Sequence, residues 1–461
     1  MLKIQPLPYK IVTFKYRYIL MTTSLKSYIV LLSLLFLTNV LFGQSTFEFS
    51  SKKKTAKIPF KLISNLIIIP VKVNGVEFSF LLDTGVKETI LFNVSKVDSL
   101  ALNKARVFTV KGANNIEISA LKSKGNLLEI ENIKSDDHVI YVAFNQETNL
   151  SAYLGEEIHG ILGYHFFKNF IVEFSYDHEF VKVYEKEVYK NKWKRFKEVE
   201  IKLLKGKPYV KAKLRDDIVE NFLLDTGMSD GLWVFKEDTV STGLFGYYED
   251  YLGMTVSGEI YGKRSKIKEL IFVGEVFNEV KISYPHMHLL PDELKNFSER
   301  AGSIGGDLLK RFTIVFDYPN SKILLKPNKY INDPFYYNKS GIIIRQDGNA
   351  YEENNNDELL NSLKDNNFIS YVDLAYLLTP EFIIDHVRKG SPAALAGILK
   401  NDILLEVNGT KTYKHSLKSI TKLFYDKENK KIKIKLQRGN QVLVKTFHLK
   451  SPLKKTSLVH N

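Results

Sequence analysis

The string FLLDTG stands at residues 80–85 and again at residues 222–227, an offset of 222 minus 80, or 142 residues. A second pair of segments keeps this offset: GILG through FSY at residues 160–176 aligns with GSIG through FDY at residues 302–318. Two separate matches at one offset indicate an internal duplication that spans most of residues 65–327.

Within each copy, short runs rich in Val, Ile and Phe alternate with turn signals such as Asn74-Gly75. Runs such as 66–73, 77–82 and 171–184 have the composition and length of β-strands. The few helix-like stretches end at residues 168–170 and 310–312. We therefore predict two nearly all-β lobes, residues 44–190 and residues 191–330.

After Pro327 the composition changes. Asn332-Asp333-Pro334 is a turn signal, and residues 352–357 form a polar run typical of a loop. Further on come GSPAALAGI at 390–398, NDILLEVNG at 401–409, a helix-like segment and an alternating strand pair. We predict a separate α+β domain at residues 356–452, with residues 331–355 as a linker that includes a candidate first strand. The expected fold class is mainly β, two lobes followed by this α+β domain.

Residues 27–42 read SYIVLLSLLFLTNVLF and follow a basic stretch without acids, which is typical of a secretory signal peptide. We expect residues 1–43 to be removed, with Met21 as an alternative start. The competing interpretation, an uncleaved anchor, needs about 20 apolar residues. The chain has no cysteine, which fits a periplasmic, envelope or secreted location equally well. After cleavage we expect no stable membrane span.

The charge distribution and the motifs that are absent argue against several other functions. The net charge is +14, but the lysines are scattered and no nucleic-acid-binding signature occurs, so we predict no nucleic-acid partner. No serine-hydrolase elbow, phosphate-binding glycine loop or His-Glu-x-x-His string is present. His286, His288 and Asp292 form a weak metal-ligand pattern, more typical of surface or packing residues. We expect no metal and no cofactor.

Asp83 and Asp225 are the candidate reacting groups. One Asp-Thr-Gly is weak evidence, because these residues often end a strand in a turn. Two copies in a duplicated frame bring two carboxyl groups together across a pseudo-twofold axis. Two such groups cannot both ionise, so one activates water and the other donates a proton to a carbonyl. Gly85 and Gly227 allow tight turns in which an amide faces a carboxylate.

These strings resemble those of the pepsin and retropepsin aspartic proteases over residues 58–327. The resemblance implies that Asp83 and Asp225 are catalytic and that Thr84 and Thr226 bridge the lobes. It also implies that the segments ending at Gly163 and Gly305 brace the two catalytic loops. Because one chain carries both half-sites, we expect a monomer to suffice for an active site.

The chain departs from this family beside the aspartates. Val86 and Met228 stand where the family usually has Ser, Thr or Ala, and neither can donate a hydrogen bond to a carboxylate. We therefore predict activity nearer neutral pH than in a stomach-type enzyme. The expected first flap, residues 108–112, contains no tyrosine.

The C-terminal motifs resemble the PDZ domains of bacterial envelope proteases, with Asn401 in place of the usual glycine. PDZ domains bind extended peptides at a sheet edge. We predict Gly341 and Ile342 as the start of the peptide-binding strand and its carboxylate loop, for a C-terminal peptide ligand. The alternative is an ordinary strand with no ligand.

The sequence thus predicts an exported aspartic endopeptidase that acts on polypeptides, with a PDZ-like domain that binds peptides or substrate. The alternative is a catalytically inactive peptide receptor that keeps the bilobal fold.

Overall fold

The computed structural model describes residues 46–92, 100–111, 117–143, 150–188, 192–215, 218–235, 245–255, 258–290, 300–353 and 376–453. The predicted signal peptide, Gly112 and Asp292 lie outside these ranges. Among the described residues, no helix is both long and apolar enough to cross a membrane.

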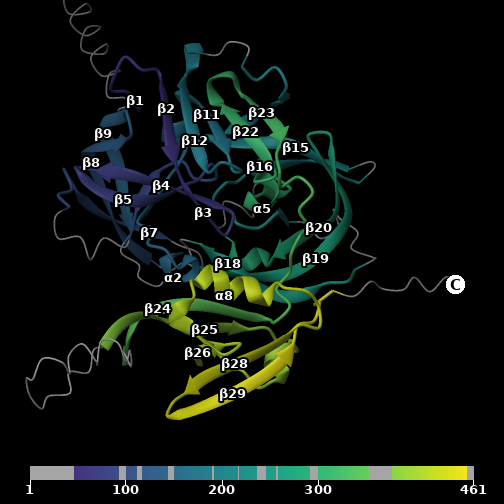
Figure 1. Ribbon diagram of the computed structural model, residues 1–461. Coiled ribbons are helices and arrows are strands. Elements are labelled where there is room, and N and C mark those ends of the chain that lie inside the picture. Colours follow the sequence, from purple (N-terminus) through teal and green to yellow (C-terminus); the bar gives the residue numbers. More distant parts are fainter. Residues whose placement is uncertain are drawn as a thin grey trace, which may run out of the picture. The chain divides into compact units, whose positions relative to one another are not determined.

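The first lobe is built around a nine-stranded sheet (Figure 1). Its strands are β1 (Glu48–Phe49), β3 (Lys61–Ile63), β4 (Leu66–Val73), β5 (Val76–Leu82), β6 (Thr89–Leu91), β7 (Arg106–Lys111), β8 (Glu117–Ile130), β9 (Ile133–Ala143) and β10 (Gly160–Leu162). β5 is apolar on both faces towards its end, where Phe80, Leu81 and Leu82 are all buried. This burial places the residues that follow Leu82 inside the lobe.

The second lobe repeats this arrangement in an eight-stranded sheet. Its strands are β14 (Lys202–Leu204), β15 (Lys207–Arg215), β16 (Ile218–Leu224), β17 (Leu232–Val234), β18 (Tyr248–Thr255), β19 (Gly258–Phe272), β20 (Glu275–Pro285) and β21 (Gly302–Ile304). β20 and β21 lie 275 minus 133, or 142, residues after β9 and β10. The sequence duplication is therefore also a structural one.

A third sheet joins the two lobes. It runs in the order β13 (Lys197–Glu200), β23 (Lys322–Pro327), β22 (Phe312–Asp317), β11 (Phe170–Ser175), β12 (Phe180–Glu185) and β2 (Thr55–Pro59). β11 of the first lobe pairs antiparallel with β22 of the second, with Val172 opposite Phe316. The buried residues of both lobes consequently form one continuous hydrophobic core.

Short helices interrupt the sheets. The expected helical stretches are α3 (Tyr164–Phe167) and α5 (Gly306–Leu309), and α2 (Leu150–Leu154) is one that the sequence pattern did not indicate. The 3-10 turns are η5 (Lys186–Val188), η7 (Met287–Leu289) and η8 (Tyr318–Asn320).

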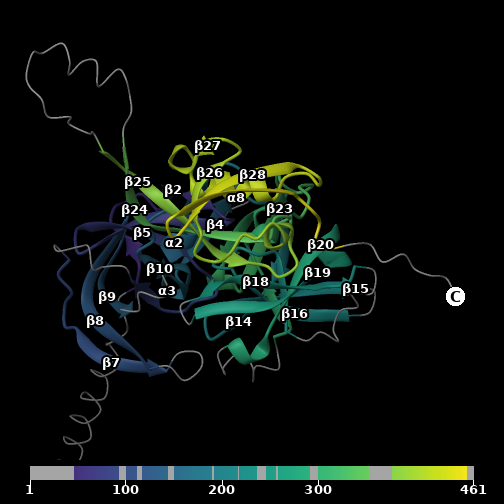
Figure 2. The ribbon, with the colours of Figure 1, turned by 90° about the horizontal axis from the view of Figure 1, so that it is seen from below.

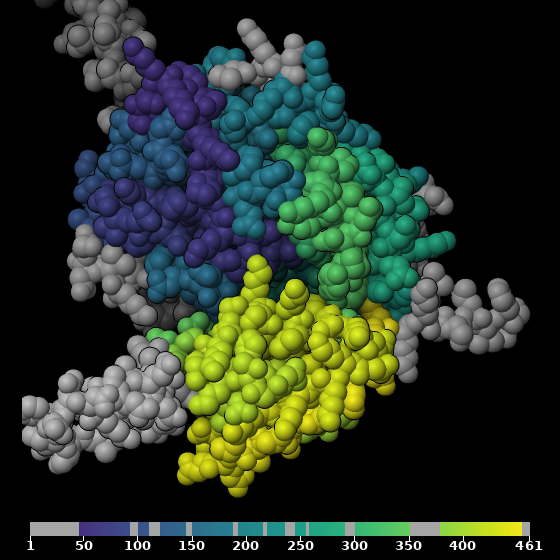
Figure 3. All heavy atoms as spheres, in the orientation of Figure 1, coloured from purple at the N-terminus to yellow at the C-terminus, as the bar shows by residue number. Residues whose placement is uncertain are grey.

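The C-terminal domain has a sheet and a hydrophobic core of its own (Figure 2). Its elements are β24 (Ile342–Glu353), β25 (Tyr376–Val387), α7 (Pro392–Leu395), β26 (Ile403–Val407), β27 (Thr410–Lys411), η9 (Thr412–Lys414), α8 (Leu417–Phe424), β28 (Lys431–Arg438) and β29 (Gln441–His448). Within the segment predicted as linker, β24 forms an edge strand of this sheet. Asn401 has φ +69°, the left-handed conformation that makes Asn an acceptable replacement for glycine. In Figure 3 the domain, in yellow, lies directly against both lobes.

Candidate active site

Asp83 and Asp225 each follow a central strand of their lobe. The Asp83 amide donates to the carbonyl oxygen of Leu162 at 3.0 Å, and the Asp225 amide donates to that of Ile304 at 2.9 Å. In this way β10 and β21, which run parallel to β5 and β16, hold the two loops in equivalent positions.

The two threonines bind the loops to each other reciprocally. The Thr84 amide donates to Oγ1 of Thr226 at 3.0 Å, and the Thr226 amide donates to Oγ1 of Thr84 at 3.1 Å. Each hydroxyl then donates across the lobe boundary, Thr84 to the carbonyl oxygen of Leu224 at 2.6 Å and Thr226 to that of Leu82 at 2.8 Å. Both threonines are buried, so these bonds are shielded from water.

The glycines of the two strings let each carboxyl group reach the opposite loop. The amides of Gly85 and Gly227 donate to Oδ1 of Asp83 and Asp225 at 2.6 and 3.1 Å. A Cβ on Gly85 would lie 2.7 Å from an Asp225 oxygen, and one on Gly227 would lie 2.1 Å from an Asp83 oxygen. Only glycine leaves room for the carboxyl pair.

Gly163 and Gly305 lie against the backbone of the two Asp-Thr-Gly loops. A Cβ at Gly163 would be 2.3 Å from the carbonyl oxygen of Val86, and one at Gly305 would be 2.5 Å from that of Met228. The next amides, of Tyr164 and Gly306, donate to these same carbonyl oxygens at 3.0 and 2.7 Å. This contact fits the bracing role that the resemblance implies.

The two carboxyl groups have different electrostatic surroundings. Burial, followed by the negative charge of Asp225, raises the pKa of Asp83 to about 8. Burial also raises the pKa of Asp225, but the positive charges of Arg300 and Lys207 oppose that rise. The charge of Arg300 thus favours the ionised form of Asp225, and the negative charge of Asp225 favours the protonated form of Asp83.

Arg300 and Lys207 are site residues that the sequence analysis missed. Arg300 is buried, and its Nε donates to the carbonyl oxygen of Gly302 at 3.1 Å, next to the strand that supports Asp225. At the offset of 142 residues their counterparts in the first lobe are Ile158 and Asn65, which carry no charge. The duplication could not reveal these two cations, because each has an uncharged residue at the equivalent position of the first lobe.

Val86 and Met228 flank the dyad and offer it no side-chain hydrogen-bond donor, because one side chain is aliphatic and the other is a thioether. Val86 packs with a first-lobe cluster that also includes Leu150 and Leu154 of α2. The expected first flap falls in the β7–β8 hairpin, where Phe108 contacts the Tyr141 ring with centroids 5.8 Å apart.

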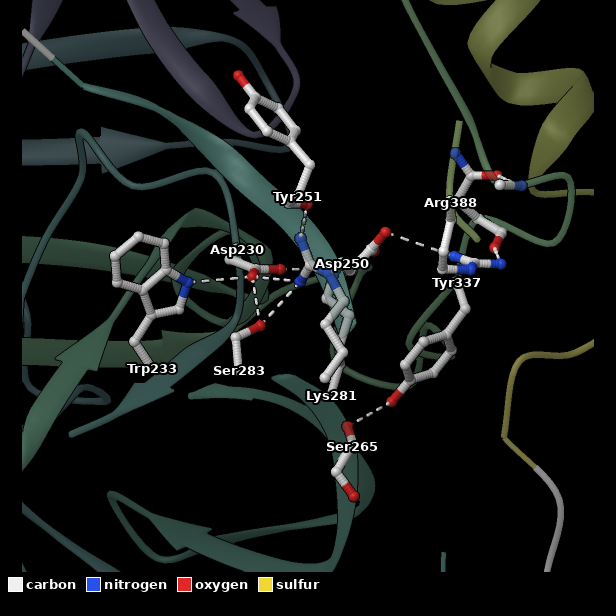
Figure 4. A network of polar contacts seen from close by, with 12 residues as sticks. Asp230, Trp233, Asp250, Tyr251, Ser265, Lys281, Ser283, Tyr337 and Arg388 are labelled. Atoms are coloured by element: carbon white, nitrogen blue, oxygen red, sulfur yellow. Dashed lines mark hydrogen bonds and ion pairs between the residues drawn. The ribbon is translucent and has the colours of Figure 1, made fainter. Parts of the chain in front are cut away.

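A charged network links the loop that follows Asp225 to the β18–β19 hairpin (Figure 4). The buried Asp230 accepts hydrogen bonds from Arg264 Nη1 at 2.5 Å, Ser283 Oγ at 2.8 Å and Trp233 Nε1 at 3.1 Å. Burial alone would raise the pKa of Asp230, but Arg264 and Lys281 outweigh it and hold this pKa well below its usual range. The carboxylate therefore stays ionised and anchors the loop.

At the C-terminal domain, the predicted peptide-binding amides have partners within their own loop. The Gly341 amide donates to Oδ1 of Asn338 at 2.9 Å, and the Ile342 amide donates to Oγ of Ser340 at 3.0 Å. α2 of the first lobe contacts both β24 and α8, and a Cβ on Gly155 would lie 2.7 Å from Cβ of Leu417. The space between β24 and α8 is thus contacted by the protease part of the same chain.

Two histidine groups bear on the metal question. His286 Nε2 lies 2.9 Å from Glu249 Oε2 and its ring stacks with that of His288, which is a packing role. Glu259, Asp385 and His386 place ligand atoms within 4.8 Å of one another. His386 Nε2 lies 2.9 Å from Asp385 Oδ2 and 3.4 Å from Glu259 Oε1.

Comparison with known families agrees with this geometry. A family model described as aspartyl protease matches residues 69–166, which include Asp83 and the brace at Gly163. A model described as PDZ domain matches residues 383–438. The chain thus contains an aspartyl protease domain followed by a PDZ domain, and the prediction of a mainly β protease fold with a C-terminal PDZ domain is confirmed. No curated protein gives a significant match to the sequence.

Proposed function

We propose that this chain is an exported aspartic endopeptidase in which Asp225 is the general base and Asp83 the general acid. The observation that carries this proposal is the reciprocal bonding of Thr84 and Thr226, which sets the two Asp-Thr-Gly loops against each other with each carboxyl group beside the glycine of the opposite loop. An inactive receptor would have no need for two neighbouring carboxyl groups whose pKa values are both raised.

The arrangement supports hydrolysis without a covalent intermediate. Asp225 takes a proton from water, whose oxygen attacks the peptide carbonyl carbon while Asp83 gives its proton to the carbonyl oxygen. The tetrahedral diol then breaks at its C–N bond. Asp225 gives the nitrogen the proton that it took from water, Asp83 takes a proton from a diol hydroxyl, and an acid and an amine leave. Asp83 ends the cycle protonated again.

The test is cleavage of an unfolded protein by the chain that begins at residue 44. We expect Asp83→Asn and Asp225→Asn each to lower the rate by about 10²–10⁴-fold, the usual contribution of general acid–base catalysis. Asp136→Asn, at a surface carboxylate with a side chain 58% exposed, is the matched control and should cleave at the full rate. Cleavage at the full rate by either single variant, Asp83→Asn or Asp225→Asn, would refute the proposal.

Export is the second part of the proposal, and it rests on the apolar run at residues 27–42. The protein recovered from the periplasm or medium of expressing cells should begin near residue 44 by mass spectrometry. Recovery of the intact N-terminus in the cytoplasm would contradict it.

A further inference from the structure

Three side chains with metal-ligand chemistry meet where the second lobe contacts the PDZ domain. They are Glu259 of β19 and Asp385 and His386 of β25, and their ligand atoms all lie within 4.8 Å of one another. Neither the proposed function nor the two family matches give these residues a role. The sequence pattern did not indicate them as a group, because 385 minus 259, or 126, positions separate the two segments.

A β-bulge in β25 brings two consecutive side chains together. Consecutive residues of β24 pair with Ile384 and His386, so Asp385 is an extra residue in the strand. In a regular strand the side chains of Asp385 and His386 would lie on opposite faces of the sheet. The bulge re-aims one of them, and both consequently reach Glu259 of the second lobe.

The distances from the ring nitrogen of His386 suit a metal ion. Zinc binds imidazole nitrogen and carboxylate oxygen at about 2.0 Å, which separates two ligand atoms of a tetrahedral site by about 3.3 Å. From Nε2 the distance is 2.9 Å to Asp385 Oδ2 and 3.4 Å to Glu259 Oε1, on either side of this value. Nε2 is buried and makes no hydrogen bond to any described residue. At 2.9 Å only an unsuitable angle prevents such a bond, so these atoms fit two ligands of one ion better than a donor and its acceptor.

The other ring nitrogen of His386 decides which form the imidazole takes. The Tyr261 hydroxyl donates to Glu259 Oε2 at 2.7 Å. Its one proton is then used, so it accepts the hydrogen bond from His386 Nδ1 at 3.2 Å. With the proton on Nδ1, Nε2 of the neutral ring carries a lone pair, which is the form that binds metals. This lone pair faces two carboxylate oxygens, and a cation between the three atoms removes their repulsion.

The remaining contacts leave one oxygen of each carboxylate for an ion. Arg345 Nε donates to Asp385 Oδ1 at 3.2 Å, and the Tyr153 hydroxyl donates to Oδ2 at 2.8 Å, which leaves Oδ2 a further lone pair. Glu259 receives the Tyr261 hydroxyl on Oε2, so Oε1 is left to face the ring nitrogen. Two cavities, of about 850 and 340 Å³, both border His386 and give an ion and a water molecule a way in.

We propose that Glu259, Asp385 and His386 bind one divalent transition-metal ion of the zinc type, with water as the fourth ligand. A nitrogen ligand beside two carboxylates favours zinc over magnesium and calcium, which take oxygen ligands. The ion ties β19 of the second lobe to β25 of the PDZ domain. The site does not depend on the proposed catalysis, because metal binding requires no turnover.

The test is isothermal titration calorimetry of the chain that begins at residue 44, dialysed first against EDTA and then against metal-free buffer. ZnCl2 should bind with a stoichiometry of one ion per chain. MgCl2 and CaCl2 should bind about 100-fold more weakly or not at all. Because the ion ties two parts of the fold together, zinc should also raise the Tm of the wild-type chain.

Two ligand variants and one control locate the ion. His386→Gln should weaken zinc binding about 100-fold. Glu259→Gln, at a side chain 34% exposed, should weaken it at least about tenfold and covers the case in which His386→Gln fails to fold. This variant should also lose the rise in Tm. The matched control is His286→Gln, which removes a histidine whose Nε2 lies 2.9 Å from Glu249 Oε2, and it should leave the zinc affinity unchanged.

Two results would overturn the proposal. One is a folded wild-type chain that binds no zinc, which would make His386 a protonated partner of the two carboxylates. The other is zinc binding that persists at full affinity in Glu259→Gln, or that disappears in His286→Gln, since the ion would then lie elsewhere.

Discussion

Arg300 gives the two carboxyl groups of the dyad different surroundings although both loops carry the string FLLDTG, whereas Lys207 acts on both aspartates. Both cations favour an ionised Asp225, and the first lobe has Asn65 and Ile158 at the equivalent positions. A shared proton needs such an asymmetry if the same carboxyl group is to be the base at the start of every cycle. Val86 and Met228 offer no side-chain donor that would stabilise an ionised carboxylate. The two cations stabilise the ionised form of Asp225 instead.

Replacing Arg300 should move the acid limb of the pH–rate profile to higher pH. Arg300 lowers the pKa of Asp225, so its removal raises that pKa, and more of the base is then protonated at a given acidic pH. We expect kcat/KM of Arg300→Met to fall off at higher pH on the acid side than in the wild type, as measured on a fluorogenic peptide.

Arg300→Lys is the matched control, since it keeps the charge, and its acid limb should stay close to that of the wild type. An acid limb that is unchanged in a folded Arg300→Met variant would show that Arg300 does not act on Asp225.

The site residues that could be predicted from the sequence are those that the duplication repeats. Asp83, Thr84 and Gly85 have copies at the same offset, and the physical chemistry of a carboxyl pair accounts for all three. Arg300 could not be found in this way, because it acts on Asp225, which lies 300 minus 225, or 75, positions away, and it has no charged copy in the first lobe. Asn338 lies outside the duplicated residues.

At the level of elements, the strand-to-loop turns decide how closely the carboxyl groups approach. Gly227 and Gly231 belong to the same loop of the second lobe, but only Gly227 faces the dyad. A Cβ on Gly227 would lie 2.1 Å from Asp83 Oδ2, whereas one on Gly231 would have no neighbour closer than 3.6 Å. The two positions form a natural pair for substitution.

Gly227→Ala should lower kcat/KM by about 10²-fold or more, because a displacement of about 1 Å at a catalytic group has effects of that size. Gly231→Ala should retain most of the activity. Circular dichroism of both variants would separate a moved carboxyl group from a misfolded chain. Equal activity of the two variants would contradict the close approach of the loops.

The elements that the sequence did not indicate are those that join the protease to the PDZ domain. α2 is only five residues long and has no periodic pattern to reveal it. Its Tyr153 hydroxyl donates to Oδ2 of Asp385 at 2.8 Å, a contact between residues 232 positions apart that no local pattern encodes. By contrast, the long alternating strands β28 and β29 were evident from their apolar spacing.

At the level of the whole molecule, the sheet that contains β11 and β22 makes the two lobes one body. Each lobe supplies one aspartate, and the pairing of these two strands fixes the lobes together within a single chain. The mainly β bilobal fold could be predicted because the duplication fixes both its repeat length and its symmetry.

A single chain should therefore suffice for activity. We expect the specific activity to stay constant when the enzyme is diluted from micromolar to nanomolar concentration, since no association step precedes catalysis. A specific activity that falls in proportion to dilution would show that a second chain completes the site.

The pH–rate profile of the mature wild-type chain tests the central claim, that Asp83 and Asp225 share one proton, most directly. In the proposed mechanism, activity requires Asp225 ionised and Asp83 protonated. It should therefore rise as pH passes the elevated pKa of Asp225 and decline as pH passes about 8, where Asp83 loses its proton. The account predicts a bell-shaped kcat/KM with its maximum between these limits. A maximum below about pH 4, with no activity left near neutral pH, would contradict it.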